Sequence, residues 1–303
     1  MKPILFPLLC TTLAVATFAA DAPVTVEAEP FQLGLSASLA TGLSGNTKLK
    51  TGSRAAGEVS TAEFDHAAAY EIKLANGGAV SVGHTFHLSR FELPENNRTV
   101  ALPKRLQSAQ AEFSYSQPCG GRWSAIAALS PGLRWAASDA GSDAFGISAA
   151  AGAIYRHSET FTLMLGLAYD SLARNKVLPG GGLQWTPSER WSVSLGYPKT
   201  AITYNASKSL SFSIVAEGVS DTYHVEKDPL PGLAGKPSLA DTKLEYNDYR
   251  VGIAAEYRFS PRCAISATAG CVVAREFDYF DRHYRLKSDD TAAYGSLALA
   301  LKF

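Results

Sequence analysis

The chain lacks most features that mark a nucleic-acid-binding protein or a helical membrane protein. Lys and Arg together number 28, as do Asp and Glu, so the formal net charge is +0. This balance does not predict the clustered basic face that nucleic-acid binding requires. After residue 22, no apolar run approaches the length of a membrane-spanning helix. If the mature chain crosses a membrane, it must do so as a closed β-barrel, because every backbone polar group needs a partner inside lipid.

Cysteine is also scarce. Cys10 lies in the amino-terminal apolar run, which leaves Cys119, Cys263 and Cys271 in the rest of the chain. Cys263 and Cys271 fall on one predicted strand, about 26 Å apart at the usual rise per residue, so they cannot pair with each other. A disulfide between Cys119 and Cys263 stays open, on the condition that their turns are neighbours. The favoured role of all three is that of small apolar fillers.

The first residues have the layout of an export signal. Lys2 supplies a positive charge, residues 4–18 form an apolar run, and the small residues Ala19 and Ala20 offer a cleavage site. We therefore expect a signal peptide at residues 1–20, cleaved on export, and a polar periplasmic leader at residues 21–30. The apolar run is too short and too early to be a spanning helix of the mature protein.

Residues 291–303 alternate between large apolar and small or polar side chains and end on an aromatic residue. Strand side chains alternate with a period of two. One face carries Gly295, Leu297, Leu299, Leu301 and Phe303, and the other carries Tyr294, Ser296, Ala298, Ala300 and Lys302. A lipid-facing strand of a transmembrane barrel needs this division. The stretch also resembles the closing strand of Gram-negative outer-membrane barrels, so we expect the first set to be a signal for the barrel-assembly machinery. An ordinary half-buried strand that ends the chain is the alternative.

Similar alternation recurs along residues 31–303, and the connections fall into two classes. Threading backwards from the carboxy terminus puts the short turns on one side, near Asn76, Cys119, Ser158, Ser188, Ser207 and Pro261. The longer loops fall on the other side, at residues 44–60, 94–104, 138–143, 172–179, 226–242 and 280–288. Bacterial barrels have this asymmetry, whereas a two-sheet sandwich has no reason for it. Residues 31–303 are therefore expected to form an all-β, antiparallel transmembrane β-barrel of about 12–14 strands.

Aromatic residues gather near both ends of the expected strands. Those near the short turns are Trp123, Tyr155, Trp185, Trp191, Phe259 and Phe303. Those near the longer loops are Trp135, Tyr169, Tyr197, Phe277 and Tyr279. Two such girdles are expected of a transmembrane barrel, because amphipathic rings prefer the level of the lipid headgroups.

Several motifs in the second part of the chain resemble a known family. They are Ser-Asp-Ala-Phe at 142–145, Leu-Pro-Gly-Gly-Gly-Leu at 178–183 with Trp-Thr-Pro at 185–187, Leu-Glu-Tyr-Asn-Asp-Tyr-Arg-Val at 244–251, and Asp-Asp-Thr at 289–291. From Arg122 onward the chain resembles an uncharacterised family of predicted Gram-negative outer-membrane barrels, catalogued only as a domain of unknown function. The likeness departs at the 226–242 loop. It implies a barrel in the outer membrane and transfers no activity.

The sequence predicts no catalytic, cofactor or metal site. His84 and His87 have an odd separation, so they lie on opposite faces of a strand and cannot share a metal. The remaining histidines lie near strand ends, where an interfacial or solvated role is expected: His66, His157, His224 and His283. The glycines at 180–182 lack the Lys of a phosphate-binding loop. Serines are abundant, but no spacing singles out a catalytic triad, so we expect no enzyme.

Charged residues fall on positions expected to face the barrel interior. They are Glu71, Lys73, Glu112, Arg134, Glu217, Arg250, Glu256 and Arg258. Charges are tolerated there only in water or in pairs, since lipid exposure costs a few kcal/mol each. Two interpretations stay open, a polar pore that these residues line and a lumen that salt bridges plug.

The sequence thus favours an outer-membrane barrel that acts as a channel for small polar solutes. The alternative is a non-conducting structural or adhesion-type barrel that acts through its outer loops, and a membrane-embedded hydrolase comes third. Expected partners are outer-membrane lipid, the barrel-assembly machinery and small solutes, with no nucleic acid and no cofactor.

Overall fold

The computed structural model describes residues 33–94, 100–137, 140–233 and 235–303. The expected signal peptide and leader, together with Cys10, lie outside these residues. Cys119, Cys263 and Cys271 are all free thiols, which removes the possible disulfide. Within the described ranges, no helix is long and apolar enough to cross a membrane.

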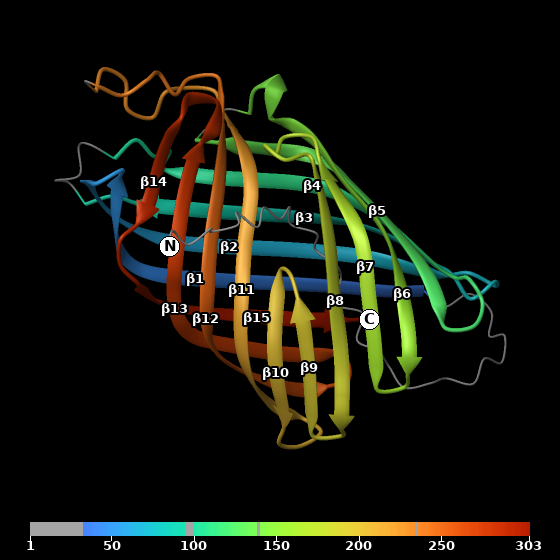
Figure 1. Ribbon diagram of the computed structural model, residues 1–303. Helices are drawn as coiled ribbons and strands as arrows, with labels where there is room; N and C mark the ends of the chain where they lie inside the picture. The colour runs from blue at the N-terminus through green and yellow to red at the C-terminus, as the bar shows by residue number, and fades with distance from the viewer. Residues whose placement is uncertain (1–32, 95–99, 138–139, 234) are drawn as a thin grey trace, which may run out of the picture.

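The described residues form fifteen strands in one sheet that closes on itself (Figure 1). Each strand from β1 to β13 pairs antiparallel with the next, and β15 pairs with both β1 and β13. The strands are β1 (Leu33–Thr51), β2 (Arg54–Lys73), β3 (Ala79–Glu92), β4 (Arg105–Pro118), β5 (Trp123–Ala136), β6 (Phe145–Ser158), β7 (Phe161–Asp170), β8 (Val177–Ser188), β9 (Trp191–Gly196), β10 (Lys199–Asn205), β11 (Leu210–Val225), β12 (Thr242–Ser260), β13 (Cys263–Tyr279), β14 (Tyr284–Ser288) and β15 (Ala292–Lys302).

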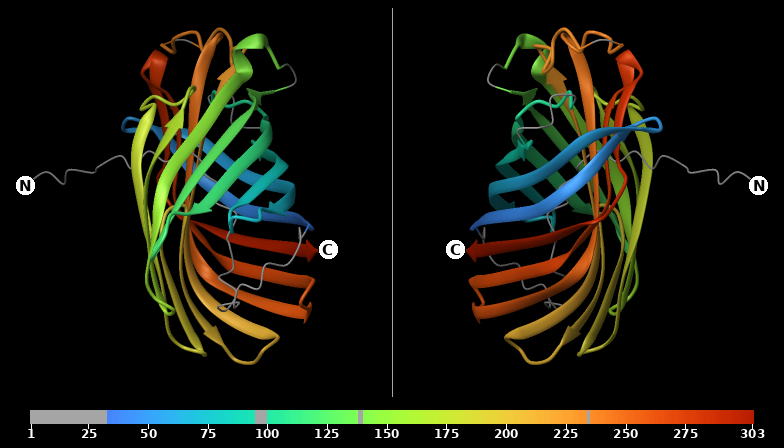
Figure 2. Two further views of the ribbon diagram at one scale, coloured as in Figure 1. Left: turned by 90° about the vertical axis from the view of Figure 1, so that its right-hand side faces the viewer. Right: turned by 90° about the vertical axis from the view of Figure 1, so that its left-hand side faces the viewer.

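β14 and β15 are two segments of one barrel position. Both pair with β13 on one side and with β1 on the other, and they are separated by the three residues 289–291. The fifteen strands therefore fill fourteen positions around the barrel. This confirms the expected all-β antiparallel barrel at the upper end of its predicted strand number. The strands are tilted, and those on opposite walls cross (Figure 2).

The two ends of the barrel differ as the sequence predicts. Short turns after β2, β4, β6, β8, β10 and β12 lie at the end that also holds the carboxy terminus, which we call the turn end. The connections after β3, β5, β7, β11 and β13 lie at the opposite end, which we call the loop end. It also carries the short helices η1 (Ser142–Ala144) and η2 (Phe280–Arg282).

The prediction of a loop at residues 44–60 is wrong. β1 and β2 continue through this region as a paired hairpin, from Ser44 opposite Thr61 to Thr51 opposite Arg54. Its Gly, Ser and Lys content resembles a loop, but Leu49 and Val59 are 1% and 0% exposed. Their burial inside the barrel holds the hairpin in the sheet. The predicted 280–288 loop likewise contains η2 and β14.

Large apolar side chains cover the outside of the barrel. Leu165, Ile214 and Ile253 are 68%, 66% and 66% exposed, and their chain neighbours point inward. Aromatic pairs ring the turn end, with ring centroids 4.7 Å apart for Trp123–Tyr155, 5.0 Å for Trp191–Tyr204 and 5.0 Å for Tyr257–Phe259. The girdle expected at this end is therefore present.

At the loop end, two members of the expected girdle point inward instead. Phe277 and Tyr279 are each 0% exposed. The reason is a β-bulge: Val272 and Ala274 pair with the adjacent residues Arg250 and Tyr249, which leaves Val273 as an extra residue in β13. One extra residue exchanges the two faces of the strand beyond it. Odd-numbered residues of β13 face outward before the bulge and face the interior after it, which is why Phe277 and Tyr279 point inward.

Candidate functional site in the barrel interior

The interior at the loop end is filled by apolar side chains, which we call the apolar plug. Phe91, Tyr246 and Phe277 pack together with ring centroids 5.1–5.6 Å apart. The plug comprises Leu49, Val59, Phe91, Val100, Ala101, Leu102, Leu106, Ala136, Tyr223, Val225, Leu239, Leu244, Tyr246, Phe277, Tyr279, Tyr284 and Leu286. These residues come from nine strands and two loops, so the plug joins both walls of the barrel.

Two loops insert residues into the plug. From the β3–β4 loop, Ala101 accepts a 2.8 Å hydrogen bond from the Tyr279 hydroxyl. From the β11–β12 loop, Leu239 is 0% exposed. That loop is folded around Asp228, whose carboxylate accepts hydrogen bonds from Lys236 Nζ at 2.8 Å and from the backbone N–H of Leu230 and Leu239. The loops thus close the barrel at this end.

A buried ion-pair network centred on Arg134 of β5 lies beside the plug. Arg134 is 2% exposed and donates to Asp170 at 2.8 Å and to Asp221 at 2.7 Å. It thereby joins β5 to β7 and β11 across the interior. Removing one partner of such a buried network costs about 3–5 kcal/mol, because it leaves an uncompensated charge.

A second buried network lies on the opposite wall. Arg250 pairs with Glu63 and with Asp248, and its guanidinium lies 4.4 Å from the centroid of the Tyr294 ring. Arg275 donates to Asp248 at 3.0 Å. These contacts join β2, β12, β13 and β15, and the carboxylates offset the charges of both guanidinium groups.

Toward the turn end, the interior is lined by small side chains and is open to solvent. Ser36, Ser38 and Ser194 face inward, since their chain neighbours Leu35, Leu39 and Leu195 are exposed outward, yet all three serines are themselves exposed. The interior is therefore accessible from the turn end and blocked by the plug and the ion-pair networks at the loop end.

The wall has one seam, between β8 and β11. β9 and β10 are short, so residues 177–181 of β8 have no partner on the β9 side, and residues 219–223 of β11 have none on the β10 side. Figure 1 shows the interruption beside the tip of the β9–β10 hairpin. β8 carries Pro179, Gly180 and Gly181 here, and Pro has no N–H to leave unpaired on such an edge.

The seam is bounded at both ends. At the end of the seam nearer the turn end, Tyr197 packs against Gly218, where an added Cβ would lie 2.7 Å from the tyrosine ring. At the loop end, His224 of β11 pairs with Trp135 of β5 in a parallel bridge. Arg174 in the β7–β8 connection lies 3.9 Å from Asp278 on β13, so this connection extends across the outer side of the seam.

The charged residues predicted to face the interior do not meet at one place. Arg134 and Arg250 lie in the two buried networks. Glu256 and Arg258 pair with each other at 2.8 Å near the turn end. Glu71, Glu112 and Glu217 are half-buried and Lys73 is exposed. A role for any of the eight in solute binding stays a prediction, as does the assembly role of the outward residues of β15.

Five members of the networks escaped the sequence analysis. Glu63 and Asp170 lie one residue beyond the expected strands, whereas Asp221 and Asp248 lie within strands and could have been found by alternation from Glu217 and Arg250. Arg275 faces inward only because of the bulge at Val273. The five network residues that the sequence did not reveal are therefore Glu63, Asp170, Asp221, Asp248 and Arg275.

Two of the histidines expected at strand ends occupy other positions. His66 lies within β2, 5.0 Å from His84 between ring centroids, on the outer face. His224 is buried at 4% exposure, so it is not solvated. His87 bonds Asp65 on the inner face at 2.6 Å, which confirms that His84 and His87 point to opposite sides.

Comparisons with known proteins agree with the fold. The family described as a domain of unknown function (DUF6268) matches residues 76–293, a span that begins before Arg122 and includes the 226–242 loop. No curated protein matches the chain. The deltaS2S3 mutant of TodX, a monoaromatic hydrocarbon channel, is similar with a TM-score of 0.51 and 10% identity over 91% of each chain. An outer membrane channel from Pseudomonas putida F1 has a TM-score of 0.49 and 8% identity, over 91% of this chain and 98% of that one.

Proposed function

The chain belongs to the family described as a domain of unknown function (DUF6268), so we propose its function from the geometry: an outer-membrane channel for small uncharged solutes, closed at the loop end. The observation that carries this proposal is the serine-lined interior that is open at the turn end. A barrel that served only as a structural element would have no need of a solvated interior on one side of a plug.

The outer surface supports a position in the membrane. Outward positions on every wall carry large exposed apolar side chains, and aromatic pairs ring the turn end, as lipid and its headgroup level require. An export signal at residues 1–20 and recognition of β15 by the assembly machinery belong to the same proposal. The turn end would then face the periplasm.

The paired charges favour uncharged solutes. Arg134 is compensated by two carboxylates, and Arg250 and Arg275 are compensated by Glu63 and Asp248. The network of Arg250 and Arg275 is neutral, and the excess negative charge of the Arg134 network is buried, so neither network presents an exposed net charge that would select an ion. The seam provides the path through the wall, beneath the β7–β8 connection, because the plug blocks the axis. The seam lies toward the loop end, so a solute that follows it passes the plug without crossing the apolar side chains. The uncharged molecules among the small polar solutes that the sequence favours fit this path best. The TodX mutant of similar fold is a monoaromatic hydrocarbon channel, and monoaromatic hydrocarbons are small uncharged molecules.

The test is liposome swelling with the purified full-length chain, with arabinose as a small uncharged probe and stachyose as a large one. We expect swelling with arabinose and none with stachyose. Gly180→Trp should reduce the arabinose rate, because the Gly180 position faces inward at the seam and an added Cβ meets nothing within 4 Å. The new side chain therefore begins in open space, and its ring is expected to extend into the path.

Gly34→Trp is the matched control. Gly34 also faces inward, and an added Cβ there meets nothing within 4 Å, but it lies on β1 near the turn end and away from the seam. The two variants should fold equally well, and only Gly180→Trp should slow swelling. Equal rates in both variants would remove the seam from the path. No swelling in the wild type would remove the channel.

The second candidate is a non-conducting barrel that acts through its loops. The observation that favours it is the apolar plug, which closes the loop end with residues of two loops. Absence of arabinose swelling in a barrel that migrates as a folded species on a gel would favour this candidate. Neither candidate involves a catalytic step.

A further inference from the structure

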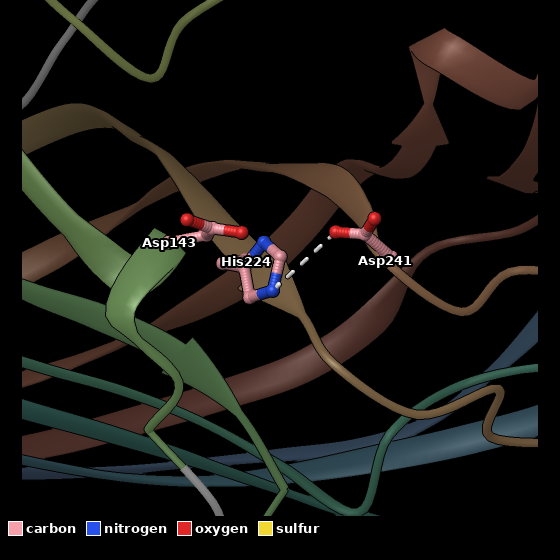
Figure 3. A group of neighbouring side chains, drawn as sticks. All are labelled: Asp143, His224 and Asp241. Atoms are coloured by element: carbon pink, nitrogen blue, oxygen red, sulfur yellow. Dashed lines mark ion pairs between the residues drawn. The ribbon is translucent and has the colours of Figure 1, made fainter.

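Three metal-ligating side chains meet at the loop end, beside the bridge between β5 and β11 (Figure 3). Asp143 comes from η1, His224 from the end of β11, and Asp241 from the residue just before β12. One ligand atom from each lies within 4.8 Å of those of the other two. His224 is 4% exposed, whereas both carboxylates are exposed, so a buried imidazole faces carboxylates that solvent ions can reach.

Three carboxylates surround His224, those of Asp143, Glu226 and Asp241, and they exceed the two nearby cations, Arg282 and Lys243, the latter being the cross-strand partner of His224. Nε2 of His224 lies 3.2 Å from Oε2 of Glu226 and 4.0 Å from Oδ1 of Asp241. One ring nitrogen provides a single N–H at most, so it cannot satisfy both oxygens. Arg282 is directed to this region, but its guanidinium donates to the backbone carbonyls of Ala240 and Asp241, at 3.1 and 3.2 Å. A cation among these oxygens would offset the excess negative charge.

We propose that Asp143, His224 and Asp241 form a site for a divalent first-row transition cation such as Zn²⁺, with Glu226 as a further ligand. A set of one imidazole nitrogen and two or three carboxylate oxygens suits Zn²⁺. Ca²⁺ and Mg²⁺ take oxygen ligands, so the buried imidazole makes them the poorer fit. The inference does not rest on the proposed solute path.

The position of the site gives it a structural role. His224 is the residue whose backbone bridges to Trp135, where β11 meets β5 at the closed end of the seam. Asp143 belongs to the β5–β6 connection and Asp241 to the β11–β12 connection, so one cation ties both loops to this bridge. Binding to the folded barrel alone raises its stability by mass action.

The experiment uses the purified full-length barrel in detergent, stripped with EDTA and titrated with Zn²⁺ by calorimetry. Heat-modifiable gel migration is measured in parallel with and without Zn²⁺. We expect one Zn²⁺ per chain and a higher unfolding temperature in its presence. Asp143→Asn and Asp241→Asn should each weaken binding by at least about tenfold, since even outer partners of metal ligands have effects of that size. Both residues are exposed, so the variants should fold.

Asp281→Asn is the control, because Asp281 is an exposed carboxylate of the same loop end outside the cluster. It should bind Zn²⁺ as the wild type does. The proposal is overturned if Zn²⁺ does not bind at one per chain, or if Asp143→Asn and Asp241→Asn bind it as tightly as Asp281→Asn. Displacement of Zn²⁺ by an equal concentration of Ca²⁺ would also overturn it, because it would show a site without the imidazole.

Discussion

Replacing Leu165 by Arg tests the assignment of the outer and inner faces. Leu165 lies in the middle of β7, points outward and is 68% exposed. A lipid-facing Arg near the bilayer midplane destabilises a barrel by about 2–4 kcal/mol. Each 1.4 kcal/mol corresponds to about a tenfold change in an equilibrium constant. Leu165→Arg should therefore lower the ratio of folded to unfolded barrel by roughly 30-fold to 1,000-fold.

Ser194→Arg is the comparison, since Ser194 faces the solvated interior from β9. Its side chain is exposed, and a charge there stays in water, so the change should be within about 0.5 kcal/mol. The assay is urea-dependent folding into liposomes, followed by heat-modifiable gel migration. Equal tolerance of the two substitutions, or greater damage from Ser194→Arg, would refute the face assignment on which the account rests.

Three further predictions concern the networks, a loop and the carboxy terminus. Arg134→Leu should destabilise the barrel by about 3–5 kcal/mol in urea unfolding, because two buried carboxylates lose their partner, whereas Arg258→Leu at an exposed pair should cost less than about 1 kcal/mol. Burial alone would raise the pKa of Asp228, but the hydrogen bonds from Lys236 and from two backbone N–H groups outweigh it and hold this pKa below its usual 3.8. The stability that these bonds contribute is therefore present above pH 3.8 and is lost as the pH falls through the lowered pKa of Asp228. Pepsin cleavage of the 226–242 loop should rise as the pH falls through this window. Asp228→Asn lacks the carboxylate, so its loop should be cleaved at every pH at which pepsin acts. Phe303→Ala should reduce the assembled fraction in cell membranes, measured by gel migration, because Phe303 belongs to the proposed assembly signal of β15.

Much of the fold follows from alternation in the sequence. The outward leucines of β7 and the inward serines of β9 are assigned correctly because the irregularities in these two pairings fall in the partner strands, between Arg156 and Ser158 of β6 and between Trp185 and Ser188 of β8. The sorting of short turns and long loops also follows from the sequence, since tight turns require Gly, Asn, Ser or Pro at particular positions.

The remaining errors have physical causes. The β1–β2 hairpin beyond Ser44 is stabilised by the burial of Leu49 and Val59 against residues of distant strands, which local composition does not indicate. The bulge at Val273 exchanges the faces of β13 without a Gly or Pro to mark it. The seam exists because β9 and β10 stop short, and the sequence shows only the proline between them and the glycines of β8. The metal cluster joins three separate segments, so no local spacing predicts it.

The central claim is that the interior is open at the turn end and closed at the loop end. The most direct measurement is labelling of Ser38→Cys with a membrane-impermeant thiol reagent, applied to either face of oriented proteoliposomes. Cys119, Cys263 and Cys271 are free, so they are first replaced by Ser without loss of a disulfide. Ser38 faces the open interior, and the account predicts rapid labelling from the turn end and none from the loop end. Equal labelling from both faces, or labelling from the loop end alone, would contradict it.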